Sequence, residues 1–198
     1  GKIGVDEYDK AYFLEFVKED KKCISYASSF GKKEISEELL NKLESFLKKY
    51  KRILIREKSA QEIINKFYKS EVVLDPTLLL NKDDWNKFIG KIKPKEKKYV
   101  LVYQLHDNSE FNKYAKEFSR KNNLKLLRVS PSINSFFRSG KLIFLPKPQK
   151  FLSYFKNAEY ILTDSFHGTV FSLLFNKKFI DVSPGKTATR IENLLELV

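Results

Sequence analysis

Short apolar runs alternate with longer segments of helical periodicity along most of the chain. Residues 35–50 place apolar side chains at helical spacing, whereas residues 52–57, RILIRE, form a short β-rich run. This change of period recurs to the end of the chain. Strands that alternate with helices through short connections are typical of a parallel sheet covered on both faces. We therefore predict an α/β protein.

The predicted elements fall into two groups that resemble two Rossmann-like units. Strands are predicted over residues 23–28, 52–57, 71–80, 99–105, 124–130, 160–164 and 178–182. Helices are predicted over residues 35–50, 59–69, 109–123, 148–158, 166–176 and 189–198. Residues 131–147 carry no clear period.

Local signals set several of these boundaries. Ser36 is a candidate N-cap, and Ser59 with Glu62 three residues later has the pattern of a capping box. Pro148 suits the first turn of a helix. Pro76 is expected to end or bend the strand that contains it.

The charged stretch 81–98 carries Gly90 and Pro94 and is the best linker candidate. We therefore expect two domains. Residues 1–93 would be the C-terminal part of an N-terminal Rossmann-like domain, incomplete at its own N-terminus, and residues 94–198 a second Rossmann-like domain.

The composition fits a folded protein that is a piece of a longer one. The 198 residues are 42% hydrophobic, which is enough to bury a core. The chain begins with Gly and contains no Met. No charged-then-apolar pattern of a signal peptide opens the given sequence, and no apolar run in it is long enough to cross a bilayer. The single Cys23 cannot form an internal disulfide. We expect a cytoplasmic protein.

The formal net charge is +13, which favours anionic partners. The lysines are scattered rather than gathered in one block, so a solvated lysine-rich surface is the simpler interpretation. No RNA-recognition motif, zinc-finger spacing or helix-turn-helix pattern is present. Nucleic acid is therefore not expected as a partner.

Ligands of open parallel sheets bind beyond the carboxyl ends of the strands. The residues that follow the predicted strands are Ser28, Ser29, Gly31, Arg56, Glu57, Lys58, Asp75, Thr77, His106, Asp107, Asp164, Ser165, His167 and Gly168. Two distant histidines and one cysteine do not form a metal-binding pattern, so no metal is expected.

The richest candidate is the turn Ser165–Gly168, which follows a strand and opens a helix. The first turn of a helix offers unpaired N–H groups and a positive dipole end to an anion. His167 there is a candidate general acid, and Gly168 allows a ligand or another backbone to approach closely. The alternative is that Asp164 or Ser165 only caps the helix and His167 bonds a carbonyl.

Arg56 ends a predicted strand and could grip a carboxylate or phosphate with two hydrogen bonds. An ion pair of Arg56 with Glu57 or Asp75 between neighbouring strands is an equally good interpretation. His106 is read first as a loop residue, and Arg190 near the last helix could face a ligand or solvent.

Four segments, in this order, resemble the polysaccharide pyruvyl transferase family. They are ISYASSFG, ILIREKSA, VVLDPTLLL followed by Trp85, and NAEYILTDSFHGTVFSLLFNKKFI. The resemblance runs from about Tyr12 to the end and is most specific at SFHG. Many members have Arg-Leu-His where this chain has Ser165-Phe166-His167. The glycine-rich and Ser-Asp-x-x-Trp segments expected of members are not in this sequence.

The resemblance implies an architecture similar to the GT-B glycosyltransferases, with the active site between two Rossmann-like domains. It implies transfer of a pyruvyl group from phosphoenolpyruvate to a sugar of a cell-surface polysaccharide or its lipid-linked precursor, as a ketal and without a cofactor. His167 would be catalytic, and the substrate-binding residues would be Arg56, Glu57, Ser165, Phe166, Gly168 and Arg190. A lipid-linked acceptor and the positive charge also suggest peripheral contact with an anionic inner membrane surface. Because this piece lacks part of that cleft, the activity is expected of the parent protein.

Two other functions are compatible with the same residues. One is a GT-B-like glycosyltransferase that uses a nucleotide-sugar donor, since function depends on the site and not on the fold. The other is a non-catalytic basic domain that binds nucleic acid or polysaccharide. Donor preference separates the first from pyruvyl transfer, and strong salt dependence would mark the second.

Overall fold

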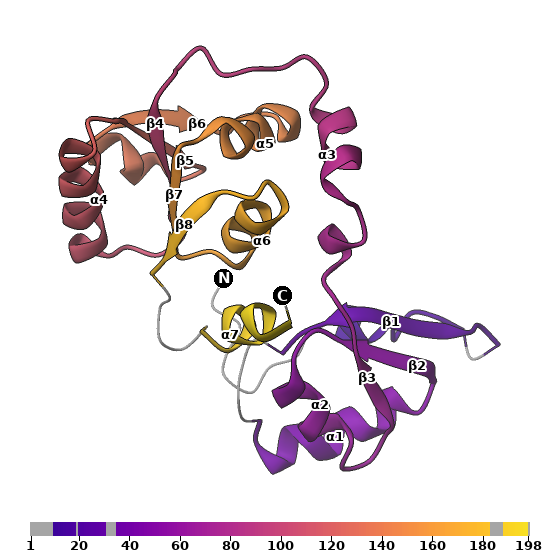
Figure 1. Ribbon diagram of the computed structural model, residues 1–198. Coiled ribbons are helices and arrows are strands. Elements are labelled where there is room, and N and C mark those ends of the chain that lie inside the picture. Colours follow the sequence, from indigo (N-terminus) through magenta and orange to yellow (C-terminus); the bar gives the residue numbers. More distant parts are fainter. Residues whose placement is uncertain (1–9, 19, 31–34, 183–187, 198) are drawn as a thin grey trace. The chain divides into compact units, whose positions relative to one another are not determined.

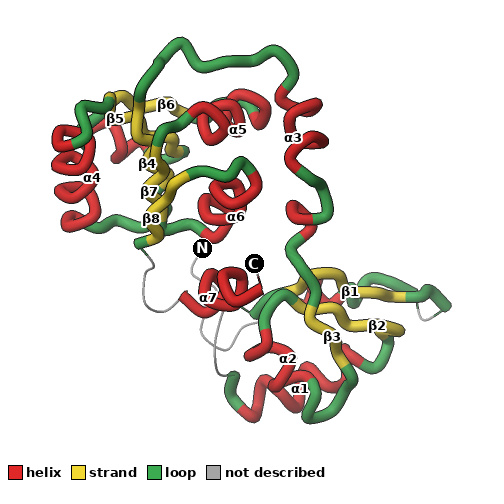
Figure 2. The backbone as a smooth tube through the Cα atoms, viewed as in Figure 1, coloured by secondary structure: helices red, strands yellow, loops and turns green. Residues whose placement is uncertain are grey.

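The computed structural model describes residues 10–18, 20–30, 35–182 and 188–197 (Figure 1). The chain divides into two compact units, one formed by the chain up to Pro76 and from Glu192 onward, the other by Thr77–Ile191. Both units combine parallel strands with helices, which confirms the α/β class (Figure 2).

The first unit contains a three-stranded parallel sheet in the order β1-β2-β3. Its apolar core is made by residues of the strands and of the two helices that connect them, including Leu43, Ile55 and Ile64. Its elements along the chain are η1 (Lys10–Phe13), β1 (Cys23–Ser28), α1 (Glu37–Leu47), β2 (Tyr50–Ile55), α2 (Lys58–Ile64) and β3 (Ser70–Val72). The last helix of the chain, α7, spans Ala188–Leu197.

The second unit contains a five-stranded parallel sheet in the order β6-β5-β4-β7-β8. Its strands are β4 (Tyr99–Tyr103), β5 (Lys125–Ser130), β6 (Lys141–Phe144), β7 (Tyr160–Thr163) and β8 (Lys178–Asp181). Its helices are η2 (Pro76–Leu78), α3 (Lys82–Ile89), α4 (Ser109–Lys121), η3 (Ile133–Phe137), α5 (Pro148–Asn157) and α6 (Phe166–Leu174).

Each face of this sheet has its own apolar core because side chains alternate along the strands. Val100 and Val102 of β4 pack with Phe111 of α4 on one face. Leu101 packs with Phe155 of α5 and Phe171 of α6 on the other. Figure 1 shows α4 on one side of the sheet and α5 and α6 on the opposite side.

Most predicted elements are present, with boundaries moved by a few residues. Ser36 accepts a hydrogen bond from Leu39 N, as expected of the cap of α1, and Pro148 stands at the start of α5. The prediction of a capping box at Ser59 and Glu62 was wrong. Helix α2 begins at Lys58, so Glu57 stands at the N-cap and Ser59 lies inside the helix.

Two stretches differ more from the predictions. The third strand ends at Val72 instead of continuing to residue 80, and the chain enters a 3-10 turn at Pro76. The charged stretch taken as a linker contains α3, which begins with a capping box between Asn81 and Asp84. Strand β6 lies in the segment that showed no clear period.

The division between the units falls after Pro76, whereas the sequence-based division falls after residue 93. Helix α3 lies between the two positions. Its Trp85 packs edge-on against Phe171 of α6, with ring centroids 5.5 Å apart, and its indole N–H donates to the carbonyl of Thr77. These contacts explain why residues 77–93 are compact with the second unit.

Candidate functional site

The carboxyl edge of the five-stranded sheet has a point at which the connections diverge. After β4 the chain crosses one face through α4, and after β7 it crosses the other face through α6. Strands β4 and β7 are neighbours in the sheet. Ligands of open α/β sheets bind where adjacent connections separate in this way, so the turns after β4 and β7 form the candidate site.

The turn from β7 into α6 is packed tightly on its own strand. Thr163 Oγ1 donates to the carbonyl of Tyr103, 2.7 Å away, and accepts from Ser165 N at 3.1 Å. A Cβ added to Gly168 would lie 2.1 Å from Thr163 Oγ1, so only glycine fits there. The close approach expected at Gly168 is thus made, in this structure, by a threonine side chain.

His167 lies in the first turn of α6 and its side chain is exposed. The neighbouring Phe166 is half-buried and meets the imidazole edge-on, with ring centroids 5.4 Å apart. The ring of Phe171, one turn further along the helix, has its centroid 6.5 Å from that of the imidazole. The imidazole therefore rests against aromatic rings at the exposed start of α6.

Neither Asp164 nor Ser165 caps this helix in the way the alternative expected. Ser165 stands at the N-cap of α6 but is buried and makes no side-chain cap bond. Asp164 is turned to the neighbouring loop instead. Its carboxylate accepts from Leu105 N at 2.7 Å and from His106 N at 2.9 Å.

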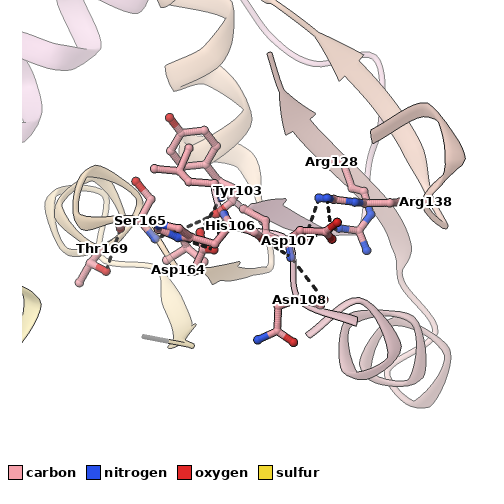
Figure 3. Close-up of polar contacts among 12 residues, drawn as sticks. Tyr103, His106, Asp107, Asn108, Arg128, Arg138, Asp164, Ser165 and Thr169 are labelled. Atoms are coloured by element: carbon pink, nitrogen blue, oxygen red, sulfur yellow. Dashed lines mark hydrogen bonds and ion pairs between the residues drawn. The ribbon is translucent and has the colours of Figure 1, made fainter. Parts of the chain in front are cut away.

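Asp164 also contacts the side chain of His106, with Oδ2 3.2 Å from Nδ1 (Figure 3). The Asp164 side chain is 3% exposed and that of His106 is 49% exposed. A buried carboxylate therefore fixes the backbone and the ring of a half-exposed histidine. Sequence reasoning treated His106 as a loop residue. The signal that could have found this pair is that each residue follows a strand of the same sheet.

A second acidic group stands at the end of β8. Asp181 accepts a hydrogen bond from the Thr169 hydroxyl of α6. Burial raises the pKa of Asp181, the Thr169 bond lowers it, and the charge of Asp164 raises it further. The helix α6 is thus tied to the strands on both sides of it, by Thr163 on β7 and by Asp181 on β8.

The carboxyl edge of the first sheet holds Arg56 and Glu57. Arg56, after β2, pairs with Asp75, Nη1 to Oδ2 at 2.5 Å, which is the ion pair between neighbouring strands left open above. Glu57 is 1% exposed, and both of its oxygens accept from Ser29 Oγ. The side chain of Arg190, and Gly31, lie outside the described residues.

Comparison with known proteins adds the family. The family model described as polysaccharide pyruvyl transferase matches residues 4–184. The chain belongs to the polysaccharide pyruvyl transferase family. This confirms the resemblance, and the match includes the whole turn from Asp164 to Gly168.

One of the solved structures similar to this chain shares its fold at a TM-score above 0.5. UDP-N-acetylglucosamine 2-epimerase from Rickettsia bellii has a TM-score of 0.51 and 12% identity, over 81% of this chain and 49% of its own. UDP-GlcNAc 2-epimerase from Methanocaldococcus jannaschii has a TM-score of 0.44 and 14% sequence identity, over 76% of this chain and 56% of its own. The expected α/β class with two Rossmann-like units resembling the GT-B architecture is confirmed.

The chain spans about half the length of these structures, 49% and 56%. No curated protein sequence matches this family member. Among the helices of the described residues, none combines the length and the apolar character needed to cross a membrane.

Proposed function

We propose that the protein containing this chain transfers a pyruvyl group from phosphoenolpyruvate to two hydroxyls of a sugar, forming a ketal. The acceptor would be a sugar of a cell-surface polysaccharide or of its lipid-linked precursor. The observation that carries the proposal is the position of His167. It lies in the matched family segment and is exposed at the first turn of α6, beside the point where the connections of the sheet diverge.

The chemistry asks for one proton donor and for cationic or N–H contacts to an anionic donor. A proton from His167 would add to the methylene carbon of phosphoenolpyruvate and leave a cation at the central carbon. One sugar hydroxyl adds there and loses its proton. The phosphate then leaves with the electron pair of its C–O bond, and the second hydroxyl adds and loses its proton. The products are the ketal and inorganic phosphate.

The first turn of α6 supplies the polar groups that such a donor needs. The backbone N–H groups of Phe166–Gly168 stand at the positive end of a nine-residue helix. Thr163 and Asp181 hold this helix in place, so the imidazole and the N–H groups keep a fixed relation. Pre-organised donors of this kind stabilise developing charge without reorganisation.

Two residues of the first unit are assigned roles in substrate binding and in positioning. Arg56 is the proposed cation for the donor's carboxylate or phosphate, and Asp75 fixes the direction of its guanidinium. Glu57 is buried against Ser29 and would position the turn after β2 rather than touch the substrate. Arg190 is proposed as a further substrate contact.

Two finer points concern location. A cytoplasmic place would supply phosphoenolpyruvate, and the net charge of +13 would draw the protein to an anionic inner membrane surface that presents a lipid-linked acceptor. Neither a metal nor a cofactor is required by the scheme, because protonation and N–H contacts supply the electrostatics.

The test is His167→Ala in the full-length protein, with release of phosphate from phosphoenolpyruvate as the measurement. Loss of a general acid should lower turnover by about 10²–10⁴-fold. Because the His167 side chain is exposed, the variant should have the same circular dichroism spectrum and melting temperature as the wild type. Tyr114→Ala, which removes an exposed ring of α4, is the matched control and should keep full activity.

Full turnover by His167→Ala would refute the proposal. So would a full-length protein that fails to bind phosphoenolpyruvate in a calorimetric titration but binds a nucleoside diphosphate. That result would favour the glycosyltransferase that uses a nucleotide-sugar donor.

A further inference from the structure

Near its end β5 carries an arginine for which none of the described residues supplies a carboxylate. Arg128 is 3% exposed and lies between the buried Leu127 and Val129. Its Nε donates to the carbonyl of Ser139 at 2.6 Å, and its Nη1 to Gln104 Oε1 at 3.2 Å. Its Nη2 is buried, and no described residue accepts a hydrogen bond from it.

A second arginine stands beside it. Arg138 Nη1 donates to the same oxygen, Gln104 Oε1, at 3.3 Å, so two guanidinium groups share one neutral acceptor. Figure 3 shows the two arginine side chains next to each other beside the loop that carries Asp107. Arg138 Nη2 pairs with Asp107 at 2.9 Å, but the Asp107 side chain is 82% exposed and largely screened by water.

The charges at this place do not balance. Burial and, as the smaller cause, the charge of Arg138 together lower the pKa of Arg128 to about 10. Arg128 is therefore still protonated at neutral pH. Two cations and a single solvent-exposed carboxylate leave one positive charge over, and a buried charge without a partner is strongly unfavourable.

We propose that Arg128 and Arg138 form an oxyanion-binding site at the carboxyl edge of the five-stranded sheet, for a phosphate or carboxylate group of a ligand. An oxyanion would neutralise the buried guanidinium and accept from Nη2 of Arg128, and the planar fork of arginine suits both groups. The site is separate from the His167 turn and does not depend on which reaction the protein catalyses.

The site is connected to the rest of the edge through the loop after β4. Gln104 and Asp107 of this loop contact the arginines, while Leu105 and His106 are held by Asp164. An anion bound by the arginines would therefore meet a loop whose other side borders the turn into α6. The loop places two binding regions on one edge of the sheet.

The experiment measures binding of two probes, inorganic phosphate and acetate, by calorimetric titration at constant ionic strength. The variants are Arg128→Met and Arg138→Met, which keep much of the side-chain volume and lose the charge. The matched control is Arg120→Met, which removes an exposed arginine of α4 in the same unit. Circular dichroism reports folding, and Arg138→Met and Arg128→Lys keep the test decisive if Arg128→Met does not fold.

We expect saturable binding of at least one probe by the wild-type chain. Each of the two methionine variants should weaken it at least about tenfold, and the control should change it less than twofold. Binding of phosphate alone assigns the site to a phosphate group, and binding of acetate alone assigns it to a carboxylate. The proposal is overturned if neither probe binds, or if both folded variants bind like the wild type.

Discussion

The carboxyl edges of the two sheets use similar residue types in opposite ways. In the first unit Arg56 faces Asp75, and Ser29 faces Glu57, so each acid meets a side-chain donor. In the second unit Asp164 accepts from two backbone N–H groups and contacts the His106 ring, and no acid among the described residues pairs with Arg128.

This difference separates two roles that a parallel sheet edge can have. Acid–base pairs between neighbouring strands make an edge electrically balanced and mechanically fixed. An acid that binds the loop backbone shapes the edge and leaves the buried guanidinium of Arg128 for a ligand. The sequence contains an acid after a strand in both units, at Asp75 and at Asp164, and only the partner of each tells the two roles apart.

The largest expected effect comes from Gly168→Ala. The new Cβ would lie 2.1 Å from Thr163 Oγ1 and 2.8 Å from Thr163 Cβ, and both groups belong to the strand on which α6 starts. We expect the free energy of unfolding of the second unit to fall by about 3 kcal/mol or more. Urea unfolding followed by circular dichroism measures it.

The double variant Thr163→Ala with Gly168→Ala is the control for this clash. Removing Oγ1 takes away the nearest contact, so the double variant should lose less stability than the sum of the two single variants. Strict additivity would mean that the close packing is not the cause.

The next effect tests whether the first edge is structural. Arg56→Gln leaves the Asp75 side chain, which is 4% exposed, without its ion-pair partner, and should cost about 2 kcal/mol of stability. Arg52→Gln is the matched control. Arg52 pairs with Glu71 between the same two strands, but the side chains of both residues are more than half exposed. We expect it to cost about 0–1 kcal/mol. Equal losses would remove the contrast between a balanced and an available edge.

The smallest effect is expected for Asp164→Asn. An amide offers one acceptor where the carboxylate offers two, so either Leu105 N or His106 N loses its partner. The cost should be about 1–2 kcal/mol. Hydrogen exchange of these two amides should become faster, while amides in the core of β4 stay protected. Unchanged exchange at both positions would contradict the proposed hold on the loop.

The fold could be predicted where the period was clear. Strand β4 was expected from the apolar run YVLVYQL, and the structure keeps its first five residues and turns Gln104 to the arginines. Helix α3 was missed because its many charges read as a linker, although Asn81 and Asp84 carried a capping signal. Strand β6 was missed because only four residues pair, at the sheet edge.

The candidate site was predictable only in part. The turn with His167 could be found because it combines a strand, a helix start and a family motif in one short stretch. The contacts of Asp164 with residues about 58 positions away could not, because no local pattern specifies them. Arg128 had one usable signal, a charged residue inside a strand expected to be covered on both faces.

The two arginines of β2 also act on strand alignment. Strand β3 has only three residues, and so few ladder bonds discriminate poorly between alternative alignments. Arg52 and Arg56 are four residues apart, as are Glu71 and Asp75, and each arginine reaches the acid nineteen positions later. A slip of β3 by one residue would break both ion pairs together. These two ion pairs thus specify the register of β3, which its few backbone hydrogen bonds specify only weakly.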